Sequence, residues 1–176
     1  MPVLIALAGI VGAIVFYLLR ARSAARAVSD LSDMANDVRL AARRFGFRRT
    51  AAQHPVETLE DPSVAVAAIA AAYLELDDLP TREQQAALSA ALERYTRLAP
   101  SEVEESLILG RWLTGQCGGA SQAVPRLAKR LYKLGGVDWF LPLMEILKAV
   151  SAAGTGAPTS RQKSALEDLR LAFRIS

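Results

Sequence analysis

The chain has 176 residues, of which 52% are hydrophobic and only 6% aromatic, a composition that favours helices over sheet. One cysteine, Cys117, and one histidine, His54, exclude an intramolecular disulfide and a Cys-x-x-Cys site, and leave little room for histidine-based chemistry. The net charge of +3 is uneven, since residues 1–49 hold eight Arg, three Asp and no Lys while residues 50–176 are net negative, so we expect no nucleic-acid partner.

Residues 2–19, PVLIALAGIVGAIVFYLL, contain no charged side chain. A helix of this length spans about 27 Å, close to the hydrocarbon thickness of a bilayer. A cleaved secretory signal is the alternative, but such signals have basic residues before the apolar run. Here the basic residues follow it, and residues 1–20 are therefore predicted to be a retained transmembrane anchor.

The arginines that follow the run predict its orientation. Eight Arg lie between positions 20 and 49, and positive residues flanking a membrane span favour the cytoplasmic side. We therefore predict a single-pass protein with its N-terminus outside and its C-terminal domain in the cytoplasm.

Residues 21–45 are predicted to form an Arg-rich juxtamembrane helix. Apolar residues between positions 28 and 45 recur at spacings of three and four, typical of a helical stripe but short of a convincing coiled coil. The stripe could form a homo-oligomer or dock on a partner; alternatively it packs on the protein's own domain or lies along the membrane.

Basic residues around this segment are candidates for contact with the lipid bilayer. They are Arg20, Arg22, Arg26, Arg43, Arg44, Arg48 and Arg49. Arginine beside phenylalanine, as in RRFGFRR, can bind anionic headgroups, or less favourably nucleic-acid phosphates. Residues 46–61 lack helical periodicity and predict a linker, in which we expect His54 to be a solvated loop residue.

Residues 62–176 predict a compact all-α domain of six helices without a strand. The first, at 62–76, is apolar nearly all round and should lie buried at the centre. Three further helices are predicted to begin at capping boxes, which are Thr81/Gln84, Ser101/Glu104 and Thr159/Gln162. Two more are predicted at about 121–134, interrupted near its start by Pro125, and at about 137–151.

Two stretches of this domain are similar. PTREQQAAL at 80–88 and PTSRQKSAL at 158–166 share five residues in register, and each follows an apolar helix and a short turn. We interpret them as two related helical hairpins produced by an internal duplication.

The stretch ELDDLPTREQ between an apolar and a capped helix, with a second such hairpin, resembles the tellurite-resistance TerB-like domain, over roughly residues 56–175. The resemblance implies an all-helical domain, a bacterial host with the protein in its inner membrane, and a link to metal binding through acidic clusters. Asp77 matches the family's Asp, whereas Asp78 replaces its Gly and Gln84 stands where an acid is usual. DjlA-type co-chaperones also carry such a domain behind an anchor, but this sequence contains no His-Pro-Asp, so J-domain activity is not expected.

The candidate metal ligands are Asp77, Asp78 and Glu83. A hard divalent cation needs about six oxygen ligands, so the alternative is a solvated turn whose acids favour the following helix start. In 114–122, TGQCGGASQ, Cys117 lacks a nearby base and the glycines lack a phosphate-binding motif, which predicts a loop between helices.

The candidate partner contacts are Arg126, Lys129, Arg130, Lys133 and Trp139. The four basic residues share one helix face, which is either solvated or touches an acidic partner or the anionic membrane. Trp139 is either core or, if exposed, part of a docking patch.

The sequence offers no plausible set of acid, base and nucleophile, so we expect no enzymatic activity and no cofactor. It predicts a membrane-anchored interaction or scaffold protein that contacts the lipid bilayer and an unidentified membrane or cytoplasmic protein. The alternative is a divalent-cation sensor or stress-response module that uses the acidic turn at 75–83.

Overall fold

The computed structural model describes residues 36–43, 53–76 and 80–175. The predicted anchor, the arginines of the N-terminal segment other than Arg39 and Arg43, and the acids Asp77 and Asp78 lie outside these residues. The chain divides into two compact units, 1–37 and 38–176, and the second is described below. Across the described ranges, no helix combines the length and hydropathy required to cross a bilayer.

The second unit is all-helical, as the sequence predicts. Its α-helices are α2 (Pro62–Glu75), α3 (Arg82–Thr96), α4 (Pro100–Gln116), α5 (Ala120–Gly135), α6 (Phe140–Ala152) and α7 (Ser160–Ala172). Two 3-10 turns, η1 (Pro55–Thr58) and η2 (Gly136–Trp139), precede α2 and α6. The described residues contain no strand, and the predicted count of six helices after the linker is confirmed.

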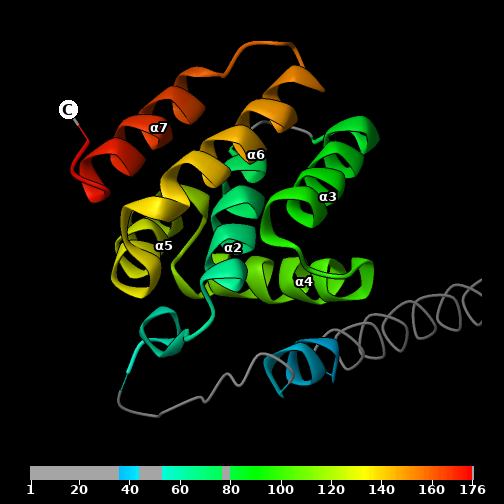
Figure 1. The fold of residues 1–176 in the computed structure, drawn as a ribbon, viewed down its shortest axis with the longest axis vertical. Helices are drawn as coiled ribbons and strands as arrows, with labels where there is room; N and C mark the ends of the chain where they lie inside the picture. The colour runs from blue at the N-terminus through cyan, green and yellow to red at the C-terminus, as the bar shows by residue number, and fades with distance from the viewer. Residues whose placement is uncertain (1–35, 44–52, 77–79, 176) are drawn as a thin grey trace, which may run out of the picture. The chain divides into compact units, whose positions relative to one another are not determined.

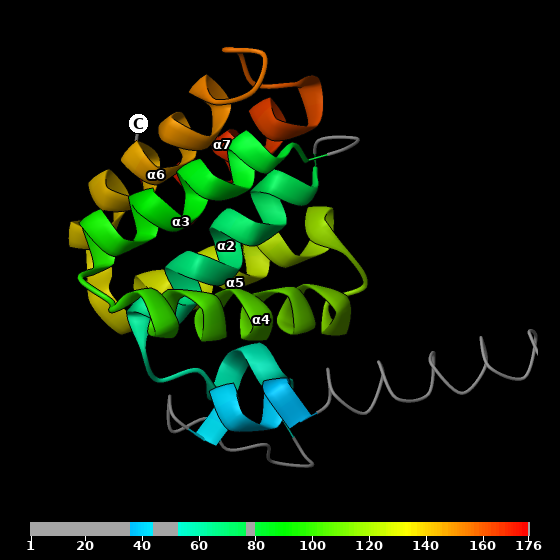
Figure 2. The same cartoon turned by 90° about the vertical axis from the view of Figure 1, so that its right-hand side faces the viewer.

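Helix α2 lies at the centre of the unit, as Figures 1 and 2 show. Asp61 caps its N-terminus by accepting a hydrogen bond from the Ser63 N–H at 2.7 Å, and every residue from Val64 to Leu74 is buried. The buried side chains include six alanines, so neighbouring helices can approach its backbone closely. At Gly110 of α4, an added Cβ would lie 2.8 Å from the Ala68 Cα.

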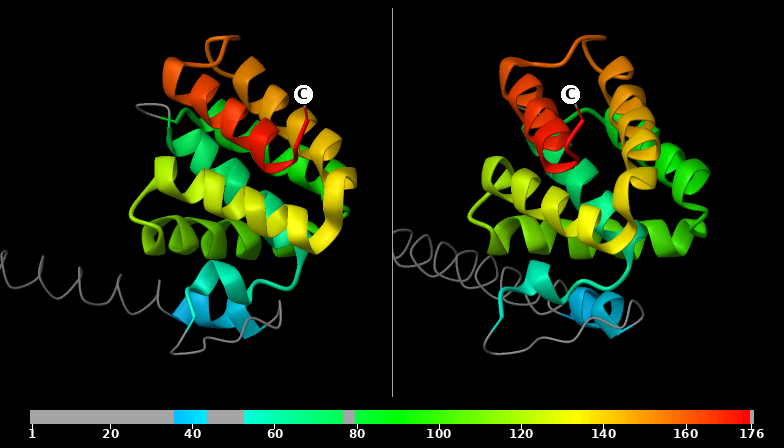
Figure 3. Two further views of the ribbon diagram at one scale, coloured as in Figure 1. Left: turned by 90° about the vertical axis from the view of Figure 1, so that its left-hand side faces the viewer. Right: turned by 60° about the vertical axis from the view of Figure 1, so that its left-hand side comes forward.

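The other three helices of the predicted hairpins, α3, α6 and α7, lie around this centre. Helix α6 contacts α2 and α3, and α7 packs on α5. Helices α7 and α3 lie on opposite sides of the unit, as Figure 3 shows. Two of the three predicted capping boxes, Thr81/Gln84 and Thr159/Gln162, are present. The Thr81 and Thr159 hydroxyls accept from the N–H of Gln84 and Gln162, whose side chains accept in return from the threonine N–H groups.

Polar side chains of each hairpin contact the other hairpin. The hydroxyl oxygens of Tyr73 and Ser151, residues 78 positions apart like the two capping boxes, lie 3.0 Å from each other. The Gln162 amide donates to the Tyr73 carbonyl at 3.3 Å. The Gln84 amide lies against Gly154, where an added Cβ would be 2.4 Å from its nitrogen. Each capping glutamine therefore reaches the other hairpin, and both are buried.

Helix boundaries differ from the prediction in two places. Helix α4 begins at Pro100 rather than after Ser101, and the Glu102 carboxylate accepts from the Ala99 N–H at 2.8 Å. The predicted Ser101/Glu104 box is therefore wrong, because proline takes the first helical position and shifts the cap by two residues. Helix α5 runs through Pro125, whose missing N–H costs one hydrogen bond near the helix start.

The predicted loop at 114–122 is also largely helical. Thr114–Gln116 end α4 and Ala120 begins α5, which leaves Cys117, Gly118 and Gly119 as the turn. Gly118 and Gly119 have φ values of 85° and 120°, a left-handed region that suits glycine. The glycines thus serve a tight reversal between two helices.

Candidate interaction surface

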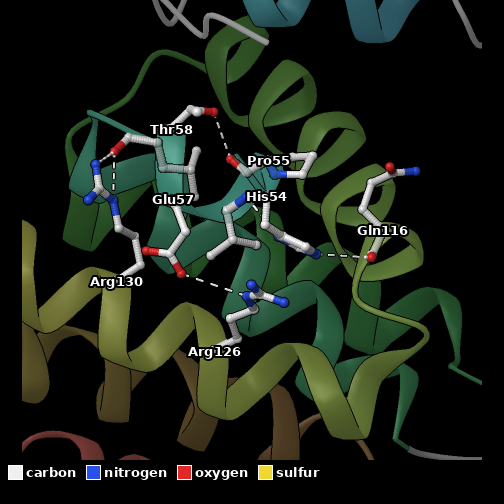
Figure 4. A network of polar contacts seen from close by, with 9 residues as sticks. His54, Pro55, Glu57, Thr58, Gln116, Arg126 and Arg130 are labelled. Carbon is white, nitrogen blue, oxygen red and sulfur yellow. Dashed lines mark hydrogen bonds and ion pairs between the residues drawn. The ribbon is translucent and has the colours of Figure 1, made fainter. Parts of the chain in front are cut away.

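The predicted linker docks on the helical unit through a structured segment, residues 53–59, which we call the strap. Its 3-10 turn buries Val56, and Leu59 is buried beside it. His54 caps the turn, since its Nδ1 accepts from the Val56 N–H at 3.3 Å. Its Nε2 lies 3.1 Å from the Gln116 carbonyl oxygen at the end of α4, so the ring is placed between two backbone groups, as Figure 4 shows.

His54 lies outside the helices, as predicted, but it is half-buried and caps η1, a role that the sequence analysis did not assign to it. A neutral ring with hydrogen on Nε2 satisfies both contacts, because Nδ1 must accept and the Gln116 carbonyl can only accept. The sequence contained a usable sign of this turn: a polar residue before Pro55, with Val56 and Leu59 three positions apart.

Two arginines of α5 hold the other end of the strap. Arg130 donates to the Leu59 carbonyl from Nε at 2.8 Å and also from Nη2. Arg126 lies 3.7 Å from the Glu57 carboxylate in a solvent-exposed ion pair, as Figure 4 shows. These two side chains of the predicted partner-contact face thus bind the protein's own linker.

The other candidate partner residues are differently placed. Lys129 and Lys133 are exposed on α5. Trp139 ends η2 and is half-buried, with its ring so close to Gly135 that an added Cβ there would be 2.1 Å from it. The contact of these residues with a partner stays a prediction.

The acidic candidates are only partly described. Glu83 is exposed in the first turn of α3, where hydrogen bonds from its own backbone N–H and the Thr81 hydroxyl lower the pKa of its carboxyl. Asp77 and Asp78 lie outside the described residues. Within the described ranges, no three His, Cys, Asp or Glu side chains are grouped to hold a metal ion.

A small hollow of about 220 Å³ lies between α2, α3 and α4, with Glu75 and Arg111 on its wall. Partial burial raises the pKa of the Glu75 carboxyl, and the charge of Arg111 opposes that effect. Burial likewise raises the pKa of the Cys117 thiol, opposed by Arg126, which keeps the thiol protonated and weakly nucleophilic near neutral pH.

Aromatic rings from the ends of α5, α6 and α7 pack together. The Phe173 ring packs on Phe140 and Tyr132, with centroids 5.3 and 5.7 Å away. Close to these rings in sequence lie Val137, Leu141 and Leu171, which are 55, 73 and 75% exposed. Sequence reasoning included only the neighbouring Trp139.

Of the lipid-contact candidates, Arg43 is described, and it is exposed near the end of the helical stretch 36–43. Val38 of the apolar stripe packs against the buried core, in agreement with the alternative that the stripe packs on the protein's own domain. Homo-oligomer formation through 28–45 stays a prediction.

Comparisons of the chain with protein-family models, with curated proteins and with solved structures found no match.

Proposed function

We propose that this protein is a single-pass, membrane-anchored interaction or scaffold protein that presents a TerB-like helical domain to the cytoplasm and has no enzymatic activity. The observation that carries the proposal is the uncharged run at residues 2–19, followed by eight arginines up to position 49. Such a run favours insertion into a bilayer, and the arginines favour retention of the following chain in the cytoplasm.

The interior of the helical unit supports a role for its surface. Among the residues that the structure describes, the buried polar side chains are Gln84, Ser106, Thr114 and Gln162. Ser106 and Thr114 donate to helix carbonyls one turn earlier, at 2.8 and 3.0 Å, and the glutamines cap α3 and α7. Because these groups maintain the helices, the exposed surface is the part available to a partner.

Cysteine labelling tests the anchor and its orientation. In a Cys117→Ser background, a cysteine is introduced by Pro2→Cys or by Ser176→Cys, and membrane-impermeant maleimide is added to spheroplasts. We expect the cysteine at position 2 to react at once and the one at 176 only after lysis. The reverse pattern contradicts the orientation, and recovery of the chain in the soluble fraction contradicts the anchor.

Crosslinking in intact membranes tests the scaffold role. The chain carries a C-terminal tag, co-purified proteins are identified by mass spectrometry, and a second version has residues 20–49 replaced by a neutral linker. A reproducible partner that survives the replacement assigns the contact to the helical domain. Self-crosslinks alone contradict the scaffold role.

The acidic turn supports a second candidate, a divalent-cation sensor. Glu75 ends α2 and Glu83 lies in the first turn of α3, so two acids flank the sequence segment that contains Asp77 and Asp78. Oxygen ligands of this type suit Ca²⁺ and Mg²⁺. Titration of the purified chain with Ca²⁺, Mg²⁺ and Zn²⁺ tests it: saturable binding lost in Asp77→Asn supports the sensor, and no saturable binding contradicts it.

A further inference from the structure

We propose that the hollow between α2, α3 and α4 binds a small zwitterion of the α-amino-acid class with an aliphatic side chain. Its wall carries one acid and one base, Glu75 of α2 and Arg111 of α4, beside apolar side chains. This site is independent of the proposed anchor and of a protein partner, and it adds a small-molecule ligand to the helical unit itself.

The size and lining of the hollow fit such a ligand. Its volume of about 220 Å³ equals about seven water molecules at liquid density and lies below the range of pockets that take drug-sized molecules. Valine or leucine is of this size. The apolar part of the wall is formed by Ala71, Leu74, Pro80 and Leu88. An aliphatic side chain placed against these groups would be removed from water, which favours binding.

The two charged residues are isolated on their helices. Glu75 is the only charged residue of α2, and Arg111 is the only one between Ser106 and the end of α4. Both charges lie on the wall of the hollow. Arg82 and Glu83, in the first turn of the neighbouring α3, are exposed and of opposite sign, so they add little net charge to it.

Local structure does not explain the position of Glu75. A carboxylate in the last turn of a helix is unfavourable, because this end of the helix dipole is negative. Partial burial raises the pKa of the Glu75 carboxyl, and the charge of Arg111 opposes that effect. Within the described residues, however, no ion pair joins the two side chains. A partly desolvated acid beside an unpaired base in a hollow is typical of a functional site.

The acid and the base complement the two charges of an amino acid. The Arg111 guanidinium can donate hydrogen bonds to a carboxylate, and the Glu75 carboxylate can accept them from an ammonium group. The Gln85 amide, also on the wall, can add a bond to either group. A ligand with only one of the two charges makes only one of these charge-assisted contacts, so it should bind more weakly.

Equilibrium dialysis with radiolabelled leucine tests the site. The full-length protein is purified in detergent micelles, and the buffer contains EDTA, so that cation binding at the acidic turn does not contribute. We expect saturable binding at a single site. Three compounds should bind at least about tenfold more weakly: leucinamide, which lacks the carboxylate; 4-methylpentanoate, which lacks the ammonium group; and glycine, which lacks the aliphatic side chain.

Variants assign each protein charge to a ligand group. Arg111→Gln should weaken leucine binding at least about tenfold but leave the binding of labelled leucinamide unchanged. Glu75→Gln should weaken leucine binding to a similar degree but leave that of labelled 4-methylpentanoate unchanged. These unchanged affinities also show that the variants are folded. Glu145→Gln and Lys148→Gln remove exposed charges of α6, which does not line the hollow, and should bind leucine as the wild type does.

Three results would overturn the proposal. The first is the absence of saturable leucine binding to the wild-type protein. The second is equal affinity for leucine and 4-methylpentanoate, which would remove the role of the Glu75 charge. The third is leucine binding that is unchanged in both charge variants, which would place the ligand elsewhere. None of these results bears on the anchor, which cysteine labelling tests separately.

Discussion

Gln162 illustrates how one side-chain amide joins two helical hairpins. Its oxygen accepts from the Thr159 N–H at 3.0 Å, and its nitrogen donates to the Tyr73 carbonyl at 3.3 Å. A glutamate could make the first contact but, when ionised, not the second. This requirement gives a physical reason for an amide at the third position of α7. The similarly buried Gln84 has its amide nitrogen against Gly154.

Gln162→Glu should therefore destabilise the protein. We expect a loss of about 1–3 kcal/mol at neutral pH, because the Tyr73 carbonyl loses a buried donor and a carboxylate replaces a neutral amide. Urea unfolding measures the difference. Gln85→Glu makes the same change at an exposed position of α3 and should stay within about 0.5 kcal/mol of wild type; an equal loss in both variants contradicts the argument.

Glu75 and Glu83 should give opposite pH dependences of stability. Burial raises the folded-state pKa of Glu75 above 4.5, so its contribution is present below that pH and is lost as pH rises through the folded pKa. Hydrogen bonds lower the folded-state pKa of Glu83, so its contribution is present above pH 4.5 and lost on acidification.

Unfolding free energies at pH 3.5 and 7 check these signs. Relative to wild type, Glu75→Gln should gain stability between the lower and the higher pH, by less than about 0.5 kcal/mol because solvent screens the partly exposed group. Glu83→Gln should lose stability over the same interval. If the stability of both variants changed in the same direction relative to wild type, the local environment would not determine the pKa shifts of these two carboxyls.

At the scale of the elements, the crossing of α2 and α4 depends on the absence of a side chain. Gly110 faces the Ala68 backbone, and an added Cβ would be 2.8 Å from its Cα. Gly115, one and a half turns later on the same helix, has no neighbour within 4 Å of such a Cβ. One helix therefore contains both a packing glycine and a glycine without a packing role.

Gly110→Ala should destabilise the protein by about 1–3 kcal/mol, because the methyl group must push two helices apart. Gly115→Ala should stabilise it by up to about 1 kcal/mol through helix propensity. Thermal and urea unfolding of the two variants measure both values. A stabilising Gly110→Ala would mean that α4 can move away from α2 without cost.

The accuracy of the sequence-based predictions also varies by element. Periodicity and caps identified α2, α3 and α7 well, because the apolar pattern and the N-terminal hydrogen bonds are local to each helix. The start of α4 was misplaced by the competing cap at Ser101. The strap was missed because His54 and Leu59 gain their partners from α4 and α5, which are about 60 to 70 residues further along the chain.

At the scale of the whole molecule, two arginines of α5 hold the strap against the helical unit. Arg130→Met keeps the aliphatic length of the side chain but removes both hydrogen bonds to the Leu59 carbonyl. We expect a loss of about 1–3 kcal/mol and faster amide hydrogen exchange at Val56 and Leu59. Lys129→Met, at the exposed position just before Arg130, should change neither the stability nor the hydrogen exchange of the strap. Unchanged exchange in Arg130→Met would mean that the buried apolar residues hold the strap alone.

The candidate sites were less accessible to sequence reasoning than the fold. The basic face of α5 was identified from its spacing, but only the structure divides it between Arg126 and Arg130, which hold the strap, and the exposed Lys129 and Lys133. The exposure of two leucines was missed because it depends on which neighbours cover a residue. Leu141 and Leu171 have the same local pattern as core leucines of their helices.

The central position of α2 has a consequence for the order of synthesis. Its fourteen residues are made before α3 to α7, and the hydrogen bond from Gln162 to Tyr73 can form only about 90 residues later. At 5–20 residues per second, the nascent apolar helix waits roughly 5–20 s for its cover. A chain that stops before Ser160 would contain all of α2 and still leave it incompletely enclosed. Removal of α7 should therefore reduce the stability of the fold, although α7 lies far from α2 in the sequence.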